Sequence, residues 1–215
     1  MSDACRLYLI TPPQIADRAN FTRELAEAMD AGDIACVQLR LKTIEGGAAP
    51  DAEVLAAAKA LAAVARDHEA AFLINDRPDL AVEAGADGVH LGQSDTAYAE
   101  ARAMLGEDAV IGVTCHNSKH LGLVAGEAGA DYVAFGAFFP TKTKDAPATA
   151  DKDILEWWAY ATTTPSVAIG GITPENCAPL VRAGADFLAV SSAIWDYADG
   201  PAAAVKAFEK AIAAA

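Results

Sequence analysis

Short runs of apolar residues recur along the whole chain, and a longer segment with helical spacing separates each run from the next. The eight runs are Leu7–Ile10, Cys36–Leu39, Phe72–Asn75, Gly88–Leu91, Val110–Thr114, Tyr132–Phe135, Ser166–Ile169 and Phe187–Val190. Their apolar residues stand at consecutive positions, which is typical of strands that are buried on both faces of a parallel sheet. The pattern therefore predicts an α/β fold in which strands alternate with helices.

A tripeptide that ends in Asp precedes every second run. It reads Ala-Gly-Asp at 31–33 and Gly-Ala-Asp at 85–87, 129–131 and 184–186. Glycine suits the left-handed residue that ends a helix, so the repeat counts βα units in pairs. Eight such units favour a closed, single-domain (β/α)8 TIM barrel over residues 1–215. An open doubly wound sheet would have the same periodicity and stays an alternative.

Prolines and capping residues predict where several helices begin. The expected starts are Pro50 or Asp51, Pro78, Thr96, Ser118 and Pro174. Proline is tolerated in the first turn of a helix, and Ser or Thr can cap its free N–H groups.

The composition narrows the class of protein. The chain has 215 residues, enough for one sizeable core, and its 16 basic and 30 acidic residues give a net charge of −14. That charge repels nucleic acid and anionic membranes, so neither is an expected partner. No apolar run reaches the roughly 18 residues that a membrane span needs. An anionic ligand would have to be attracted by a local site or by a bound cation.

The amino terminus and the cysteines point to a cytoplasmic protein. The first five residues lack the basic start and apolar core of a signal peptide. Cys5, Cys36, Cys115 and Cys177 show no C-x-x-C spacing, so we expect reduced thiols. The expected partners are small molecules, and the sequence leaves open whether the chain forms a homo-oligomer.

A basic loop follows the sixth run on this otherwise acidic chain. After Pro140 come Thr141, Lys142, Thr143 and Lys144. Two hydroxyls and two ammonium groups on one loop are suited to holding phosphate oxygens. The alternative is a solvated loop with two surface lysines.

The end of the second run also carries positive charge. Strand alternation puts Gln38, Arg40 and Lys42 on one side and Leu39 and Leu41 on the other. One amide and two cations at a strand end could bind a polar ring and an anion. The alternative is a strand end with solvated charges.

Two carboxylates lie just beyond the third and fourth runs. Asp76 follows Asn75, and Asp95 follows the segment that begins with His90. Since active sites of (β/α)8 barrels lie at the carboxyl ends of the strands, the pair could share Mg²⁺, which prefers oxygen ligands. As alternatives, Asp95 could be a helix N-cap and Asp76 could pair with Arg77.

The fifth run ends in Thr114, followed by Cys115 and His116. A thiol–imidazole nucleophile is disfavoured because adjacent strand residues point in opposite directions. His116 and His120 could face one another on a helix, but no third ligand for zinc is evident. Thr114 is the more useful residue, as a hydroxyl at the strand end.

A second anion site is expected after the last two runs. Gly171 follows the seventh run, and Ser191 and Ser192 follow the eighth. Glycine lets main-chain N–H groups approach a phosphate closely, at the usual phosphate position of such barrels. Two phosphorylated ligands in one barrel suggest a transferase that joins them.

These residues resemble the thiamine phosphate synthase (thiamine-phosphate pyrophosphorylase) family from Leu7 to about Ile194. The motifs that carry the resemblance are LYLIT, VQLRLK, LINDRPDLAVEAGADGVHLGQSD, IGVTCHN, GADYVAFGAFFPTKTK, AIGGIT and SSAI. The resemblance implies a (β/α)8 barrel that joins hydroxymethylpyrimidine diphosphate to hydroxyethylthiazole phosphate and releases pyrophosphate, with Mg²⁺ as cofactor.

The resemblance also implies a role for each matching residue. The pyrimidine diphosphate site would comprise Gln38, Leu39, Arg40, Leu41, Lys42, Asn75 and Lys144, and Mg²⁺ would be held by Asp76 and Asp95. The thiazole phosphate would be bound by Thr141, Lys142, Thr143, Gly171, Ser191 and Ser192. Catalytic roles would fall to Arg40, Lys42, Lys144 and Thr114, the last standing where the family usually has Ser.

The expected mechanism is dissociative. Cations neutralise the charge on departing pyrophosphate, and the aminopyrimidine feeds electrons to the methylene carbon. The thiazole nitrogen then attacks and has no proton to lose, so no general base is needed. A related thiazole phosphate tautomerase and a non-catalytic thiamine phosphate-binding barrel remain alternatives.

The chain departs from the usual family pattern in three places. Leu41 stands where Glu is frequent, Thr11-Pro12-Pro13 replaces Thr-Asp, and the Glu45–Pro50 loop is altered. We expect these changes to affect substrate affinity more than the reaction.

Overall fold

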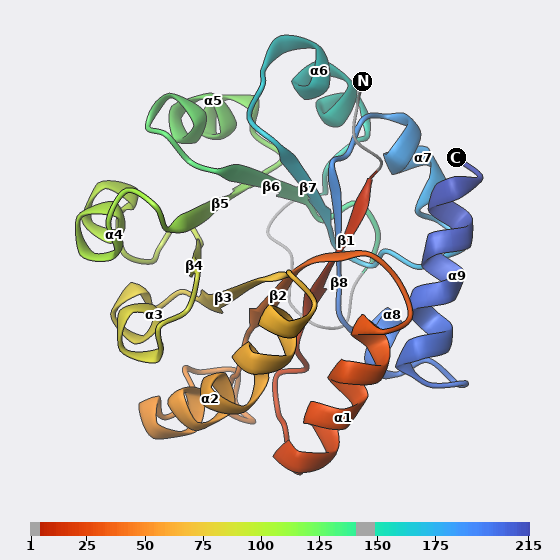
Figure 1. Cartoon of the computed structure of the whole chain (residues 1–215). Helices are drawn as coiled ribbons and strands as arrows, with labels where there is room; N and C mark the ends of the chain where they lie inside the picture. The colour runs from red at the N-terminus through yellow and green to blue at the C-terminus, as the bar shows by residue number, and fades with distance from the viewer. Residues whose placement is uncertain (1–4, 141–148) are drawn as a thin grey trace.

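A ring of parallel strands, surrounded by helices, forms the computed structural model of the protein (Figure 1). The structure describes residues 5–140 and 149–215. The strands are β1 (Arg6–Ile10), β2 (Ile34–Leu39), β3 (Ala71–Asn75), β4 (Gly88–Leu91), β5 (Val110–His116), β6 (Tyr132–Gly136), β7 (Ser166–Ile169) and β8 (Phe187–Val190). The helices are α1 (Arg18–Met29), α2 (Asp51–Asp67), α3 (Pro78–Ala84), α4 (Tyr98–Leu105), α5 (Lys119–Glu127), α6 (Asp153–Ala161), α7 (Ala178–Arg182), α8 (Ser192–Trp195) and α9 (Pro201–Ala213).

Pairing between the first and last strands closes the ring. Each strand pairs in parallel with the next along the chain, and β1 also pairs with β8 from Arg6 to Leu9. This confirms the predicted (β/α)8 barrel and excludes the open doubly wound sheet. Every predicted run coincides with a strand to within two residues at either end.

Alternate residues of each strand face two different cores. On β1, Leu7 and Leu9 lie in the core between the barrel and the helices, whereas Tyr8 and Ile10 lie in a second core inside the barrel. The inner core also contains Cys36, Leu73, Tyr132, Ala134, Val167 and Ala189. Because both faces of a strand are buried, apolar residues stand at consecutive positions in the sequence.

Three of the predicted helix starts are confirmed. Pro50 precedes the first residue of α2, Pro78 is the first residue of α3, and the Ser118 hydroxyl accepts a hydrogen bond from the Leu121 N–H of α5 at 3.2 Å. Proline and a capping hydroxyl therefore act here as their chemistry predicts.

The other two helices begin later than predicted. Helix α4 begins at Tyr98 rather than Thr96, after an extended Ala97. Helix α7 begins at Ala178, four residues after Pro174. The delay of α7 has a local cause, because the Asn176 side chain accepts the Thr173 N–H at 2.8 Å and closes a separate turn ahead of the helix.

The Asp of each tripeptide repeat lies at the amino-terminal end of the barrel. In three of the four repeats its carboxylate accepts a main-chain N–H near the start of the preceding strand. The pairs are Asp87 with Phe72 at 2.7 Å, Asp131 with Ile111 at 2.8 Å and Asp186 with Ser166 at 2.7 Å. In the remaining repeat, Asp33 binds the Arg6 guanidinium. These bonds fasten neighbouring strands together at the end of the barrel opposite to the predicted site.

No helix in the described ranges is long and apolar enough to cross a membrane.

Candidate active site

The end of β2 separates its side chains as the alternation predicted. Gln38 is buried inside the barrel, whereas Leu39 and Leu41 belong to the outer core. Arg40 and Lys42 are half-buried beyond the strand end. A ligand at this strand end could therefore meet Leu39 and Leu41 only through their main chain.

The β1 end fixes the course of the chain through Arg40 and Lys42. The Thr11 hydroxyl accepts the Arg40 N–H at 2.9 Å, and the Pro13 carbonyl accepts the Lys42 N–H at 2.8 Å. Lys42 also forms an isolated antiparallel bridge with Ala48, which folds the following loop back over it. The residues at Thr11–Pro13 and in the Glu45–Pro50 loop, where the sequence departs from the family pattern, thus position the two cations.

Lys42, Asp76 and Asp95 meet across the ends of β2, β3 and β4. The Lys42 ammonium donates to Asp76 Oδ2 at 2.9 Å, and Asp95 Oδ2 accepts the Gly92 N–H at 2.7 Å. Asp76 adopts a left-handed backbone with φ +66° and donates its N–H to the His90 carbonyl at 2.8 Å. A non-glycine residue held in that conformation is a feature that clusters at functional sites.

The two carboxyl groups of this trio are shifted in opposite directions. Burial by itself would raise the pKa of Asp76, but hydrogen bonds from Lys42 and Asp95 and the Lys42 charge hold the pKa below its usual value. The pKa of Asp95 is raised by burial and by the neighbouring Asp76. A cation bound by the two carboxyls would favour the ionised form of both, which is how metal binding couples to proton release.

Burial also affects Arg40. It lowers the pKa of the guanidinium, and the negative charge of Asp76 opposes that effect. Because arginine stays protonated in proteins, the result is a partly desolvated positive charge beside the carboxylate pair.

Both structural alternatives for the aspartates are wrong. Asp95 does not cap α4, since no side chain caps that helix and its carboxylate turns back to Gly92. Asp76 pairs with Lys42 rather than with Arg77. The Arg77 guanidinium instead binds Asp51 and Asp79, which joins the starts of α2 and α3.

Asp76 and Asp95 have the donor chemistry for a hard divalent cation. Within residues 5–140 and 149–215, no group of three or more His, Cys, Asp or Glu side chains is placed to hold a metal. A pair of carboxylates is nevertheless a common Mg²⁺ site, since the ion keeps several waters and takes further oxygens from substrate phosphates. Burial and the neighbouring Asp76 both disfavour the charge on Asp95 and raise its pKa, and a bound dication would offset that cost.

A line of polar side chains crosses the interior of the barrel; we call it the buried polar chain. Its six members, in order of contact, are Asn75, Gln38, Tyr8, Tyr132, His90 and Thr114. The successive distances between their polar atoms are 2.6, 3.1, 2.9, 2.8 and 2.8 Å. The chain joins the predicted pyrimidine residues at the ends of β2 and β3 to the Thr114 hydroxyl on β5.

Three members of this chain, Tyr8, Tyr132 and His90, were not predicted as site residues. Each lies inside an apolar run, so the sequence pattern assigns it to the hydrophobic core. They stand at the alternate positions of β1, β6 and β4 whose side chains point into the barrel. That alternation is the signal that could have identified them. Gly112 is a second signal, because a Cβ there would lie 1.8 Å from the Tyr132 ring.

Cys115 and His116 form no catalytic pair. The Cys115 thiol is fully buried, and burial raises its pKa to about 12. His116 ends β5 with φ +52° and lies outside α5, so it does not face His120 across a helix turn as the spacing allowed. A buried neutral thiol is a poor nucleophile.

The seventh strand end carries the predicted glycine turn. Gly170 and Gly171 have φ of +106° and +63°, and a Cβ on Gly171 would lie 2.4 Å from the Pro140 carbonyl oxygen. Asn176 fixes this turn, since its amide donates to the Gly171 carbonyl at 3.0 Å and accepts the Thr173 N–H. Asn176 was not predicted, and its position in G-G-I-T-P-E-N is the signal that was missed.

The eighth strand end lies next to the first. Ser191 follows β8, and its hydroxyl donates to the Thr11 carbonyl at 3.4 Å; Ser192 is exposed and begins α8. The predicted residues Thr141, Lys142, Thr143 and Lys144 lie outside the described residues. Gly171 contacts Phe139 and Pro140, the residues that lead to them in the chain.

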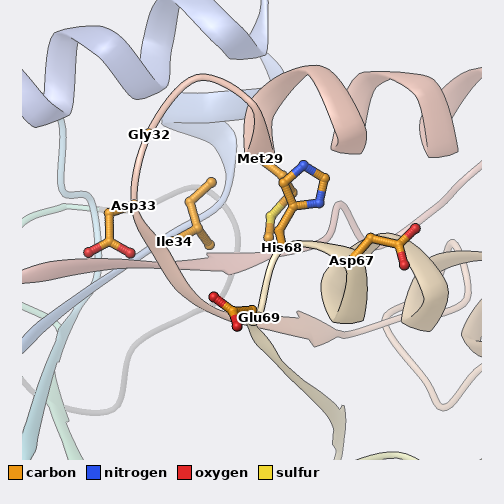
Figure 2. A pocket seen from close by; sticks show the side chains of 7 residues that line it. All are labelled: Met29, Gly32, Asp33, Ile34, Asp67, His68 and Glu69. Atoms are coloured by element: carbon orange, nitrogen blue, oxygen red, sulfur yellow. The ribbon is translucent and has the colours of Figure 1, made fainter.

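A cavity of about 380 Å³ lies at the opposite end of the barrel (Figure 2). The loops before β2 and β3 line it with Met29, Gly32, Asp33, Ile34, Asp67, His68 and Glu69. The His68 ring binds the Asp30 carboxylate and the Val64 carbonyl. The lining of the cavity contains three acidic side chains and no lysine or arginine, so it suits phosphorylated ligands less well than the strand ends where Arg40 and Lys42 lie.

Comparison with known proteins decides the family. Residues 7–194 match the sequence profile of the family described as thiamine monophosphate synthase. The chain belongs to the thiamine monophosphate synthase family. Two relatives named thiamine-phosphate synthase, from Rhodospirillum centenum and Hyphomonas neptunium, are 57% and 55% identical to it. The alignments cover 96% of this chain and 97% of the first relative, and 94% and 91% for the second.

A solved structure agrees with this membership. The thiamine phosphate pyrophosphorylase from Pyrococcus furiosus superposes with a TM-score of 0.83 at 30% identity, over 97% of this chain and 96% of that one. The family match runs from β1 through α8 and leaves α9 outside. It therefore contains every strand end described above.

Proposed function

We propose that the protein joins 4-amino-2-methyl-5-hydroxymethylpyrimidine diphosphate to 4-methyl-5-(2-hydroxyethyl)thiazole phosphate, giving thiamine phosphate and pyrophosphate. The observation that carries this proposal is the trio of Lys42, Asp76 and Asp95, beside the partly desolvated Arg40, at the strand ends of a family member. Cations and a carboxylate pair that gather at one place suit a diphosphate leaving group.

The two substrates occupy opposite sides of the barrel end in this proposal. The pyrimidine diphosphate lies over β2 and β3, bound by the side chains of Gln38, Arg40, Lys42, Asn75 and Lys144 and by the main chain at Leu39 and Leu41. The thiazole phosphate lies over β7 and β8, bound by Gly171, Ser191, Ser192, Thr141, Lys142 and Thr143. The hydrogen bond from the Asn176 amide supports the second site, because it holds the Gly171 carbonyl in place before a ligand binds.

Asp76 and Asp95 would hold Mg²⁺. The ion would supply positive charge against the diphosphate oxygens, which lowers the cost of releasing them. Lys42 already neutralises one oxygen of Asp76 in the structure. The site therefore already holds one cation against the carboxylate pair.

The residues of the chain favour departure of pyrophosphate in two ways. The main-chain N–H groups of Arg40 and Lys42 bind the Thr11 hydroxyl and the Pro13 carbonyl, so the backbone that carries both cations is fixed before substrate binds. Arg40 is partly desolvated, which strengthens its attraction for a developing anion. Lys144 would add a third cation and Thr114 a hydroxyl near the pyrimidine ring. No base is needed, since the attacking thiazole nitrogen carries no proton.

We place the enzyme in the cytoplasm as a single barrel domain over residues 1–215 that acts on small molecules. The four cysteines support this location, because all are buried free thiols.

Pyrophosphate release tests the function. With both substrates and Mg²⁺, the protein should release pyrophosphate and form an equal amount of thiamine phosphate. Omitting either substrate or the metal should stop both products. Folded protein that binds thiamine phosphate but never forms it would refute the proposal and would leave a binding barrel or a thiazole phosphate tautomerase instead.

A further inference from the structure

The buried polar chain has a direction. Gln38 uses an amide hydrogen to bind Asn75 Oδ1 at 2.6 Å, so its own oxygen faces Tyr8 and receives the Tyr8 hydrogen at 3.1 Å. Tyr8 has no second hydrogen, so the 2.9 Å contact with Tyr132 requires Tyr132 to be the donor.

The same logic fixes the tautomer of His90. Tyr132 has given its hydrogen to Tyr8, so His90 Nδ1 must donate to the Tyr132 oxygen at 2.8 Å. In a neutral ring, Nε2 is then an acceptor, and it receives the Thr114 hydroxyl hydrogen at 2.8 Å. The Thr114 oxygen is left with lone pairs only.

We propose that Tyr8, Tyr132 and His90 are positioning residues that set opposite hydrogen-bonding polarity at the two ends of the buried polar chain. Gln38 and Asn75 present amide N–H donors at the ends of β2 and β3. Thr114 presents an acceptor at the end of β5. The geometry that carries this is the unbroken series of contacts between side chains that are buried inside the barrel.

This polarity selects one kind of ring. A heteroaromatic ring with an acceptor nitrogen on one edge and an exocyclic amino group on another offers the complementary set, whereas an oxo group would place an acceptor against the Thr114 acceptor. The site then discriminates 4-amino from 4-oxo pyrimidines through residues that touch neither. This step rests on the proposed function, because it assumes that the ring lies between these strand ends.

Solid packing supports a positioning role. His90 stacks on Tyr132 with ring centroids 5.6 Å apart, and Tyr8 meets Tyr132 edge-on at 5.8 Å. Gly112 leaves the space that the Tyr132 ring fills. Each inner member of the chain both gives and receives a hydrogen bond, so reversing one hydrogen would set two donors or two acceptors face to face, and the hydrogens must reverse together.

The ¹⁵N chemical shifts of the His90 ring test the polarity without substrate. Protein labelled at histidine is measured at about pH 8, where imidazole is ordinarily neutral, and the His90→Gln spectrum identifies the His90 signals among those of His68, His116 and His120. A protonated Nδ1 with an unprotonated Nε2 is expected. A protonated Nε2 would overturn the proposal, with or without a proton on Nδ1.

Ring selectivity gives the second test. Calorimetry measures the Kd of the 4-amino and 4-oxo pyrimidine diphosphates with Mg²⁺ and without the thiazole. In Tyr132→Phe the break in the chain should reduce the preference for the amino ring roughly tenfold, the effect of one buried hydrogen bond. Tyr98→Phe, which removes a hydroxyl bonded to the Gly129 carbonyl, should leave the preference unchanged.

The two tests separate this inference from the proposed function. An unchanged preference in Tyr132→Phe would overturn the positioning role even if the enzyme makes thiamine phosphate. If the wild-type protein binds neither ring, the proposed function fails and the His90 tautomer alone decides the polarity.

Discussion

At the amino-terminal end of the barrel, Asp87, Asp131 and Asp186 each accept a main-chain N–H, whereas at the carboxyl-terminal end Asp76 meets Lys42 and a second carboxyl group. The first group completes hydrogen bonds that a strand start would otherwise lack. The second group brings the carboxyl groups of Asp76 and Asp95 together, and Lys42 neutralises only part of their negative charge. The same side chain therefore fastens strands at one end and leaves charge for a ligand at the other.

The comparison shows that the place of an Asp in the βα unit decides its role. An Asp just before a strand finds unpaired N–H groups of the neighbouring strand start. An Asp just after a strand lies among loops that hold few such donors, and at Asp76 the backbone is left-handed as well. Variants at the two ends should therefore separate activity from stability.

The largest effect on activity is expected for Asp76→Asn. Asparagine tolerates the left-handed backbone at this position, so the fold should persist. The substitution removes the negative charge that would bind the metal beside Asp95 and that pairs with Lys42. We expect kcat/KM for pyrophosphate release to fall by roughly a hundredfold or more, as for other electrostatic catalytic groups. Melting followed by circular dichroism should show little loss of stability. Wild-type turnover with Mg²⁺ would show that Asp76 does not hold the metal.

Asp186→Ala should have the opposite profile. It leaves the Ser166 N–H at the start of β7 without its acceptor, which should lower the free energy of unfolding by about 2 kcal/mol. Activity at 25 °C should stay close to wild type. Asp186→Asn is the matched control, because it keeps an acceptor oxygen and should recover most of the stability. A fall in kcat with unchanged stability would contradict the division between the two ends.

Asn176→Ala should affect one substrate only. Loss of its bonds to Gly171 and Thr173 frees the glycine turn, so KM for the thiazole phosphate should rise roughly tenfold, which corresponds to one hydrogen bond. The KM for the pyrimidine diphosphate is the internal control and should not change. Equal changes in both would mean that Asn176 supports the whole barrel end rather than one site.

The smallest effect is expected at His68, beside the cavity of the amino-terminal end. Its bond to Asp30, with a further contribution from the Val64 carbonyl, raises the pKa of the ring. Because the pKa of the ring is higher in the folded state, protonation of His68 stabilises the fold at any pH below the ordinary histidine pKa. This stabilisation is lost as the pH rises through the pKa of the folded state. His68→Gln should therefore cost a few tenths of a kcal/mol at pH 5.5 and nothing at pH 9. Urea unfolding at both pH values measures this, and an equal loss at both would contradict it.

Much of the fold can be predicted from the sequence, because a strand that is buried on both faces has apolar residues at consecutive positions. Closure does not follow in the same way, since it depends on pairing between Arg6–Leu9 and β8, far apart in the chain. The start of α7 was misplaced for a local reason, because the pattern at Pro174 does not show that the Asn176 side chain forms its own turn.

The candidate site was predictable where its residues are polar and stand at strand ends, as Arg40, Lys42, Asp76 and Asp95 do. The pairing of Lys42 with Asp76 was not predictable, because Arg77 is nearer in sequence. Tyr8 and Tyr132 were missed because they are 124 positions apart and each belongs to an apolar run. Only the closed barrel brings their hydroxyls together.

Binding of Mn²⁺, measured by electron paramagnetic resonance with the pyrimidine diphosphate present, tests most directly whether the chemistry lies at the carboxyl-terminal end. Manganese favours the same oxygen ligands as Mg²⁺. The account predicts that the wild-type protein and Asp186→Asn bind the ion equally well and that Asp76→Asn binds it at least about tenfold more weakly, as expected when a charged ligand is lost. Equal binding by all three proteins would contradict it.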